Sequence, residues 1–373
     1  MDFSFDEEQL AVSELAQQIL EGQLGHDALK EHAASGEPFP ARVWDELAKA
    51  GLVGIALPTE FGGAGLGFTS ACLVLEQVGR TTAPVPYLAS VVLGGLPVAE
   101  FGSDALKADL LPGVADGSTV LTAALHEEGT TPSRPLVEAR HDGDDWRLSG
   151  TKSMVPFGLQ AQRVLVPARV GEDEVAVFVI RTDADGVSQE ALDTTSGLPE
   201  SVLELSDVHV ASGDLLGTVD DGGAIVDWIV QRATAAMCAT AIGVCAEALH
   251  LTAEYTKTRE QFDRPIATFQ AVGQRAADAF IDTEAVRLTA WQAVWRLSEG
   301  LPAAEQVAVA KFWTAEGGQR VVHAAQHLHG GMGVDRDYPL HRYFLWAKQL
   351  ELGLGGGTRS LLDLGARIAE EPV

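Results

Sequence analysis

The stretch YTKTREQFDRPIATFQAVGQR (residues 255–275) interrupts a long helical region of the sequence. The segments around it, 224–257 and 269–299, are rich in alanine and have the length and apolar spacing of long helices. Two further segments of this kind, 303–328 and 340–352, follow after short connections. Because long helices joined by short connections pack against one another, the C-terminal part of the chain is predicted to form a helix bundle.

Two regions of different character precede the bundle. Residues 1–117 have apolar residues at helical spacing, for example Leu15 and Ile19. Residues 118–220 contain short valine-rich segments that partly alternate and are separated by Asp-Gly turn signals, which is typical of antiparallel strands. The predicted fold is therefore α+β and multi-domain, with an N-terminal α-helical domain (1–117), a middle antiparallel β-domain (118–220) and a C-terminal four-helix bundle (221–373).

Composition restricts the classes of function. The net charge of −27 excludes nucleic acid and an anionic membrane surface as partners. No apolar run is expected to reach the length needed to span a bilayer, and the acidic start MDFSFDEEQL does not resemble a signal peptide. The three cysteines, Cys72, Cys238 and Cys245, have no metal-ligand spacing and form no disulfide framework. These features predict a protein of the cytoplasm.

The stretch 255–275 resembles the signature Y-x-x-x-R-x-Q-F-G-x-x-I-x-x-F-Q of acyl-CoA dehydrogenases. A second stretch, HLHGGMGVDRDYPLHRYF (327–344), is similar to that family's Q-x-x-G-G-x-G-Y-x-x-x-x-P segment. The resemblance covers nearly the whole chain. The short, non-catalytic β subunits of heterotetrameric acyl-CoA dehydrogenases that degrade steroid (cholesterol) side chains in actinobacteria are most similar, including MDF at the start and REQFDRPI in the bundle.

The resemblance implies an FAD enzyme that introduces an α,β double bond into an acyl-CoA thioester. In the family, the arginine of the first motif reaches across a dimer interface to the pyrophosphate of the neighbouring FAD, and Arg259 matches it. A guanidinium suits this task because it is always charged and binds two oxygens at once. Without the motif, Arg259 would be a solvated arginine beside Glu260. The other implied cofactor residues are Gln261, Phe262, Gln270, His327, Leu328, His329, Gly330 and Gly331.

Two further features of these motifs are an aspartate in the turn and a group of histidines. Asp263 replaces the usual glycine of the first motif, so the local turn is open to question. The histidines at 323, 327, 329 and 341 have no carboxylate or cysteine at ligand spacing, so no metal site is predicted.

The half of the site that would hold the chain's own flavin differs from the family. The stretch AALHEEGTTPS (123–133) stands where the family has T-E-P-x-A-G-S-D, with its order scrambled. In GTKSMVPFG (150–158), Met154 and Pro156 replace the tryptophan and the threonine or serine that pack on the flavin ring. Pro156 has no backbone N–H to donate, and Met154 has no aromatic face.

The catalytic base also has no counterpart. The family's glutamate lies in a loop that matches ELGLGGGTRS (351–360), where its position is taken by Leu354, or by Gly356 when the alignment is fixed on Thr358. Some members place the glutamate on the first bundle helix, at the position of Ala233. The glycine run follows a helix and lacks the phosphate-loop pattern, so we interpret it as the remnant of a lost base site.

Three functions remain open from the sequence. The favoured one is a non-catalytic subunit that completes the FAD site of a catalytic partner in an α2β2 tetramer with two FAD, the acyl-CoA being bound mainly by the partner. The second is a self-sufficient homo-oligomer with a relocated base, Glu351 or Glu247, although Glu247 lies fourteen residues beyond Ala233, about 21 Å along a helix. The third is a flavin-free scaffold. Which acyl-CoA reacts is not encoded in these motifs.

Overall fold

The computed structural model describes residues 5–370. Within them, the chain forms two compact units. Unit 1 contains residues 5–34, 72–83 and 234–370, and unit 2 contains residues 35–71 and 84–233. Helices α4 and α7 each contribute to both units. The division into three sequential domains remains a prediction, since compactness groups helices from both ends of the chain.

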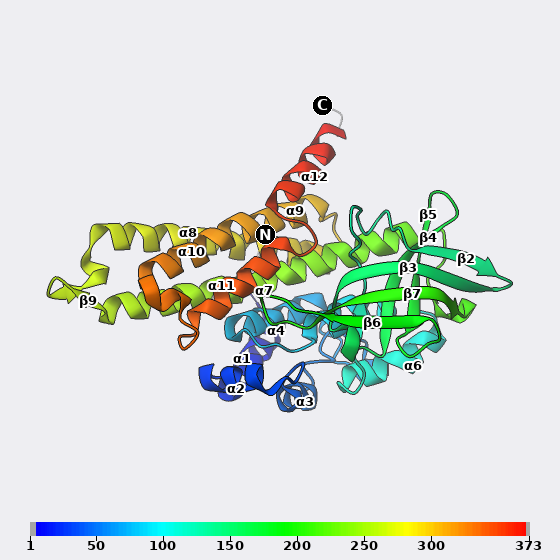
Figure 1. Ribbon diagram of the computed structural model, residues 1–373, viewed down its shortest axis with the longest axis horizontal. Coiled ribbons are helices and arrows are strands. Elements are labelled where there is room, and N and C mark those ends of the chain that lie inside the picture. Colours follow the sequence, from blue (N-terminus) through cyan, green and yellow to red (C-terminus); the bar gives the residue numbers. More distant parts are fainter. Residues whose placement is uncertain (1–4, 371–373) are drawn as a thin grey trace. The chain divides into compact units, whose positions relative to one another are not determined.

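Unit 1 is helical, and the predicted bundle helices are present. The predicted helix 303–328 is interrupted by a π-helical turn, and a last helix that the sequence reasoning missed, α12, packs on α9. The elements are α1 (Glu7–Gln23), α2 (His26–Ser35), α4 (Gly67–Thr81), α7 (Gly222–Thr258), α8 (Gln270–Ser298), α9 (Ala304–Phe312), η6 (Trp313–Gly317), α10 (Gly318–His329), η7 (Gly330–Val334), α11 (Leu340–Leu352) and α12 (Gly357–Glu370), shown in Figure 1.

Helix α7 corrects one expectation from the sequence. It is long and apolar enough to cross a membrane by length and composition, so the statement that no such segment exists is wrong. However, 72% of its apolar window is buried inside the protein, as in a core helix. Its many alanines are apolar and raise the hydropathy of the helix. Their small side chains also allow close packing with neighbouring helices.

Two glycines set the distance between α4 and α7 in unit 1. A Cβ atom at Gly243 would lie 1.9 Å from the carbonyl oxygen of Glu76, and one at Gly79 would lie 1.9 Å from that of Thr240. Both neighbours are backbone atoms, which have little freedom to move. The helices therefore approach each other as closely as they do only because both positions lack a side chain.

Unit 2 contains an eight-stranded sheet in the order β6-β7-β3-β2-β4-β5-β8, with β1 paired to β4. The strands are β1 (Leu121–Ala123), β2 (Glu138–Asp142), β3 (Asp145–Pro156), β4 (Arg163–Val170), β5 (Glu174–Arg181), β6 (Val187–Leu192), β7 (Glu200–Val210) and β8 (Leu215–Leu216). The helical elements of unit 2 are α3 (Ala41–Lys49), η1 (Thr59–Phe61), η2 (Leu88–Gly95), α5 (Leu96–Phe101), α6 (Asp104–Ala115), η3 (Gly158–Gln160) and η4 (Ser212–Asp214).

The sheet is mixed, so the prediction of a wholly antiparallel β-domain is wrong in this respect. β4 runs parallel to both β1 and β2. The reason is the path of the chain: β3 folds back on β2 as a hairpin, and β4 reverses direction again before it pairs on the other side of β2. Alternation of apolar and polar residues along a strand shows which of its faces is buried. It does not show which strand lies beside it or in which direction that strand runs.

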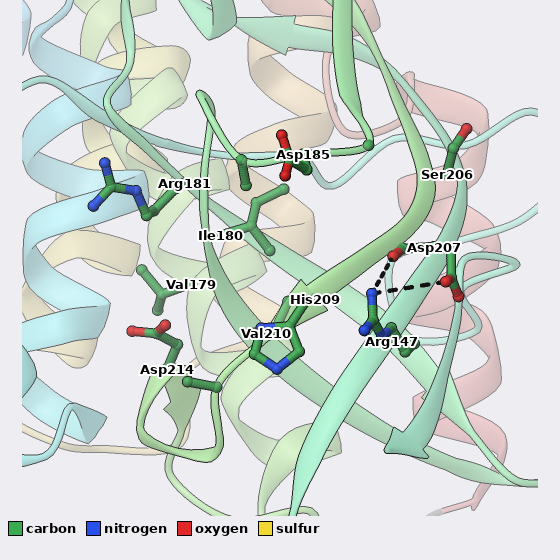
Figure 2. Close-up of a pocket in the computed structure, with 13 residues that line it drawn as sticks. Arg147, Val179, Ile180, Arg181, Asp185, Ser206, Asp207, His209, Val210 and Asp214 are labelled. Atoms are coloured by element: carbon green, nitrogen blue, oxygen red, sulfur yellow. Dashed lines mark hydrogen bonds and ion pairs between the residues drawn. The ribbon is translucent and has the colours of Figure 1, made fainter.

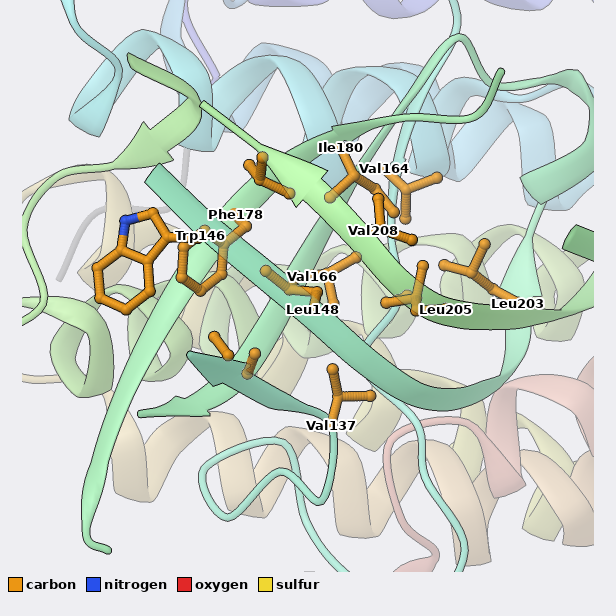
Figure 3. Close-up of a cluster of buried hydrophobic side chains, with 14 of the residues drawn as sticks. Val137, Trp146, Leu148, Val164, Val166, Phe178, Ile180, Leu203, Leu205 and Val208 are labelled. Atoms are coloured by element: carbon orange, nitrogen blue, oxygen red, sulfur yellow. The ribbon is translucent and has the colours of Figure 1, made fainter. Parts of the chain in front are cut away.

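The buried face of the sheet forms one hydrophobic core (Figure 3). The ring of Trp146 meets that of Phe178 edge-on, with centroids 5.3 Å apart. Leu148, Val166 and Leu203 are fully buried beside them. Valine and alanine make up most of the rest, and the branched side chain of valine fills a pleated surface well. This core fixes strand β3, which carries the positions expected to face a flavin.

Candidate functional site

The first motif forms a tight hairpin between the end of α7 and the start of α8 (Figure 1). Strands β9 (Glu260–Gln261) and β10 (Arg264–Pro265) pair through the two-residue turn Phe262-Asp263. Both turn residues have positive φ, 54° and 60°, as in a type I′ turn. The replacement of glycine by Asp263 therefore leaves the turn intact, because aspartate tolerates the left-handed conformation better than most residues.

The side chains of this hairpin are directed away from the bundle. Phe262 is 87% exposed, and Gln261 and Arg259 are also exposed. Within residues 5–370, Arg259 has no hydrogen bond or ion pair from its guanidinium. By contrast, Arg264 on the same hairpin lies over the ring of Phe269, 4.2 Å from its centroid. Gln270 begins α8 and is exposed as well. The hairpin thus presents an unpaired charge and an aromatic ring.

The second motif ends α10 with a backbone turn that needs glycine. Gly330 has φ 59° and ψ −133°, a conformation that side-chain-bearing residues rarely adopt. A Cβ atom at Gly330 or at Gly331 would meet no atom within 4 Å, so the backbone here is open on one side. An exposed backbone turn of this kind lets another molecule approach the peptide groups closely.

Aromatic stacking brings the two motifs together. The ring of Tyr255, one helical turn before Arg259, stacks on His329 with centroids 4.3 Å apart. Tyr338 closes the stack, because its hydroxyl donates to Nε2 of His329 at 3.1 Å. In addition, Arg275 donates to Nδ1 of His327 at 3.0 Å. Tyr255 and Arg275 belong to the first motif, but neither was predicted to hold the second motif in place.

His329 has an internal role in this arrangement. It is 3% exposed, and its Nδ1–H donates to the carbonyl of Ala325 at 2.8 Å. Burial lowers the pKa of His329, while the bond to Ala325 acts in the opposite direction, so the ring is neutral with Nε2 as acceptor. Leu328 is likewise buried in α10. A direct contact of either side chain with a cofactor remains a prediction, whereas Arg259, Gln261, Gln270 and His327 are exposed.

The positions expected for a catalytic base carry no proton acceptor. Ala233 is buried. After α11, Leu354 has φ 55° and Gly355 has φ 99°, which turns the chain sharply into α12. Lys311 holds the start of this turn by donating to the carbonyls of Leu350 and Glu351 at 2.5 and 3.1 Å. Burial lowers the pKa of Lys311 to about 8.

The two alternative bases are both engaged in ion pairs. Oε2 of Glu351 accepts from Lys348 at 2.5 Å, and Oε2 of Glu247 lies 3.4 Å from Nε of Arg80. Burial raises the pKa of Glu247, against the opposing effect of Arg80. In both cases a cation already occupies one oxygen of the carboxylate and holds the side chain in place. These contacts favour a structural role for both residues.

In unit 2, the positions expected to face a flavin form part of an irregular strand. Met154 lies in a bulge of β3 between Lys152 and Val155, with φ 50°, and is half exposed. The carbonyl of Pro156 accepts a hydrogen bond from the hydroxyl of Thr122 at 2.7 Å. Neither residue has an aromatic ring, and Pro156 has no backbone N–H to donate. Aligned with the family, this part of the chain offers little to a flavin ring of its own.

A buried ion pair anchors the scrambled segment 123–133 to the same strand. Nζ of Lys152 donates to Oε1 of Glu127, and both side chains are buried. Oε2 of Glu127 accepts from the backbone N–H groups of Leu136 and Val137 at 2.6 and 3.1 Å. Burial lowers the pKa of Lys152, and Glu127 opposes that effect. The sequence reasoning gave neither residue a role, because no periodic pattern marks a pair 25 positions apart.

Unit 2 also contains a cavity of about 590 Å³ at the edge of β5 and β7 (Figure 2). Its floor includes Val179, Ile180 and Val210. Charged side chains also line it, and one of them, Arg147, lies 3.7 Å from a carboxylate oxygen of Asp207. No residue predicted from the motifs lines this cavity, so its volume alone does not identify it as the functional site. In the part of the chain that the structure describes, no group of three metal-ligating side chains is present either.

Comparison with protein families gives two matches. The model described as "Acyl-CoA dehydrogenase, N-terminal domain" matches residues 6–118, and "Acyl-CoA dehydrogenase, C-terminal domain" matches residues 220–369. Among curated proteins, acyl-CoA dehydrogenase FadE27 of Mycobacterium tuberculosis (strain ATCC 25618 / H37Rv) is 39% identical, over 100% of both chains.

Two solved structures are similar along nearly the whole chain. A variant of the Tcur3481–Tcur3483 steroid ACAD is 44% identical with a TM-score of 0.92, over 98% of both chains. The ChsE4–ChsE5 complex from Mycobacterium tuberculosis is 40% identical with a TM-score of 0.94, over 100% of both chains.

Proposed function

Because the chain belongs to the acyl-CoA dehydrogenase family, we propose that it is a non-catalytic subunit of an FAD-dependent enzyme that introduces an α,β double bond into a steroid side-chain acyl-CoA. It completes the FAD site of a catalytic partner subunit in an α2β2 tetramer, and the partner supplies the base and most of the acyl-CoA site. The protein acts in the cytoplasm.

One observation carries this proposal: the two motifs meet at an exposed end of the bundle, where Arg259 has no partner within the described chain. Gly330 and Gly331 leave the neighbouring backbone open, as a dinucleotide requires. Arg259 fits a pyrophosphate, because a guanidinium bonds two phosphate oxygens at once. The hairpin would hold this charge in place, and the Tyr255–His329 stack would keep the glycine turn beside it.

The division of labour follows from what the chain lacks. Bound FAD supplies the acceptor for the β hydrogen of the substrate as the α proton is removed. That proton needs a carboxylate on the opposite face of the Cα–Cβ bond. The chain has Ala233, Leu354 and Gly356 at the expected positions, so it is suited to holding the cofactor and not to moving the proton.

A partner subunit also fits the exposed apolar side chains of unit 1. On α8, Phe280, Ile281 and Leu288 are 57%, 62% and 48% exposed. On α12, Leu362 and Ile368 are 65% and 58% exposed. Apolar groups of this size on a folded surface are typical of protein interfaces. The similar solved structures include a complex of two named proteins, ChsE4 and ChsE5, which supports a second acyl-CoA dehydrogenase subunit as the partner.

Replacing Arg259 with alanine tests the cofactor half-site. In the assembled complex, Arg259→Ala should weaken FAD binding by about 1.5–3 kcal/mol, the range for a hydrogen bond to a charged group. This corresponds to about a 10- to 100-fold rise in the Kd for FAD. The Kd is measured by titrating deflavinated complex with FAD, and assembly is followed by size-exclusion chromatography.

Arg264→Ala is the matched control for this experiment. It removes the same charge from the same hairpin, but its guanidinium lies over Phe269 within the chain. It should leave the Kd for FAD nearly unchanged, and Arg259→Lys should be intermediate because it keeps the charge and loses the planar fork. Equal effects of the two alanine variants would show that overall charge, not a contact of Arg259, matters.

Restoring a glutamate in this chain is expected to leave it inactive. Gly356→Glu is suited to the test, since a Cβ atom there meets only the carbonyl of Glu351 at 3.9 Å. A base contributes about 10²- to 10⁴-fold in rate, but only opposite a flavin. Met154 and Pro156 replace the flavin-packing residues, so no substrate should react in this chain's own cleft. Acyl-CoA oxidation is measured in a complex whose partner has lost its base.

Ala233→Glu, at the other position where the family places its base, is a second variant for the same test and should also be inactive. Flavin content is measured with the activity and should remain two FAD per tetramer. Recovery of oxidation together with four FAD per tetramer would contradict the proposed loss of the chain's own flavin site.

A further inference from the structure

Unit 1 contains a second cavity, of about 210 Å³, which is lined by none of the predicted cofactor residues. Four separate segments form it: the end of α1 together with the start of α2, the end of α4, the middle of α7 and the start of α11. Most of its polar lining is charged or aromatic. The polar side chains are Glu21, His26, Arg80, Thr81, Thr82, Glu247, Arg342 and Tyr343.

Arg80 balances the acidic part of this lining. Its Nε lies 3.4 Å from Oε2 of Glu247 and 3.9 Å from Oε1 of Glu21. The side chain of Glu21 is half exposed and therefore well solvated. Tyr343 is also engaged, because its hydroxyl donates to the carbonyl of Arg80 at 2.8 Å. The two carboxylates thus share one guanidinium, and the second guanidinium of the cavity is not needed to balance a buried acid.

That second guanidinium belongs to Arg342 and has no carboxylate partner within residues 5–370. Its Nη1 donates to Nδ1 of His26 at 2.7 Å. Nε2 of His26 donates in turn to the carbonyl of Asp337 at 2.9 Å, so the imidazole is a neutral acceptor and brings no negative charge. Burial lowers the pKa of Arg342, since the charge is partly removed from water. Several of its five N–H donors remain for another acceptor.

Thr82 provides an independent sign that a ligand belongs here. It is 2% exposed, and its hydroxyl has no hydrogen-bond partner within the described chain. Leaving a buried hydroxyl unpaired is unfavourable. Thr82 also has φ 47°, which is a strained conformation for a β-branched residue. Strain of this kind persists only where the surrounding structure holds the residue in place.

We propose that this cavity binds a small oxyanion, either free phosphate or the carboxylate of a small metabolite, through the guanidinium of Arg342, and that the hydroxyl of Thr82, whose oxygen is closed off from solvent, turns to donate a second hydrogen bond. Both groups donate hydrogen bonds, and the guanidinium matches two oxygens of one anion. The volume suits a few non-hydrogen atoms and is below the range of about 300–1,000 Å³ for drug-sized ligands. The site is separate from the proposed function and does not depend on it.

Equilibrium dialysis of the full chain against radiolabelled inorganic phosphate tests the proposal. One saturable site per chain is expected, in the millimolar range or tighter. Arg342→Gln should weaken binding by about 10-fold or more, because it removes charge-assisted bonds. Thr82→Val, which keeps the branched shape and loses the hydroxyl, should weaken it about 3- to 10-fold. Competition by acetate or malonate at lower concentration than phosphate would identify a carboxylate as the preferred ligand.

Arg336→Gln is the control, because it removes an exposed arginine close in sequence that does not line the cavity. It should bind phosphate like the unmodified chain. If Arg342→Gln is poorly folded by circular dichroism, Arg342→Lys gives the same comparison with the charge retained. Absence of saturable binding of phosphate, acetate and malonate up to about 20 mM, well above a millimolar Kd, would overturn the proposal. Equal affinity in the Arg342 and Arg336 variants would do so as well.

Discussion

The chain purified without a partner is expected to oxidise no acyl-CoA, even when FAD is supplied. The reason is the absence of a carboxylate at Ala233, Leu354 and Gly356, together with the ion pairs that engage Glu247 and Glu351. Loss of a positioned base alone costs about 10²- to 10⁴-fold in rate. The proposed loss of the chain's own flavin contacts would add to it. Activity should therefore fall at least about a thousandfold below that of the complex.

The measurement is reduction of an artificial electron acceptor with steroid side-chain acyl-CoA substrates. The control is the same chain co-expressed with an acyl-CoA dehydrogenase partner, which should be active and contain flavin. Turnover by the isolated polypeptide would favour the homo-oligomeric alternative. In that case Glu351→Gln and Glu247→Gln would identify which carboxylate acts as the base.

Replacing Lys152 with methionine should produce the largest loss of stability. The variant leaves the carboxylate of Glu127 buried without its cation. Breaking a buried pair on one side costs about 3–5 kcal/mol, because the remaining charge is neither solvated nor neutralised. The expected result is a lower midpoint of urea unfolding, followed by tryptophan fluorescence. Trp146 in the core of the same sheet is a suitable reporter.

A second variant separates the charge from the packing. Lys152→Met with Glu127→Gln removes both charges, while the amide oxygen can still accept from the N–H groups of Leu136 and Val137. It should recover part of the lost stability. Arg140→Gln breaks an exposed pair with Asp207 on the same sheet and should have little effect. A Lys152→Met variant as stable as Arg140→Gln would show that the buried pair contributes nothing to the fold.

Local patterns in the sequence were sufficient to predict the long bundle helices and to locate the two motifs. The boundaries of α7, α8 and α11 lie close to those predicted, because the periodicity of a long helix is repeated over many residues. The α12 helix was missed, because a run of glycines does not predict that a helix begins there. The motif residues Arg259, Gly330 and Gly331 were found through resemblance, and their direct contact with FAD remains a prediction.

The contacts between segments distant in the chain were decided only by the tertiary structure. The parallel pairing of β4, the Tyr255–His329 stack and the Lys152–Glu127 pair each join segments distant in the chain. No periodic signal specifies such contacts, because they depend on how whole faces pack and on which polar groups lose water. The sequence by itself therefore determined the long bundle helices and the types of residue present. Packing determined that Arg259 has no partner among the described residues and that Arg342 and Thr82 line one cavity.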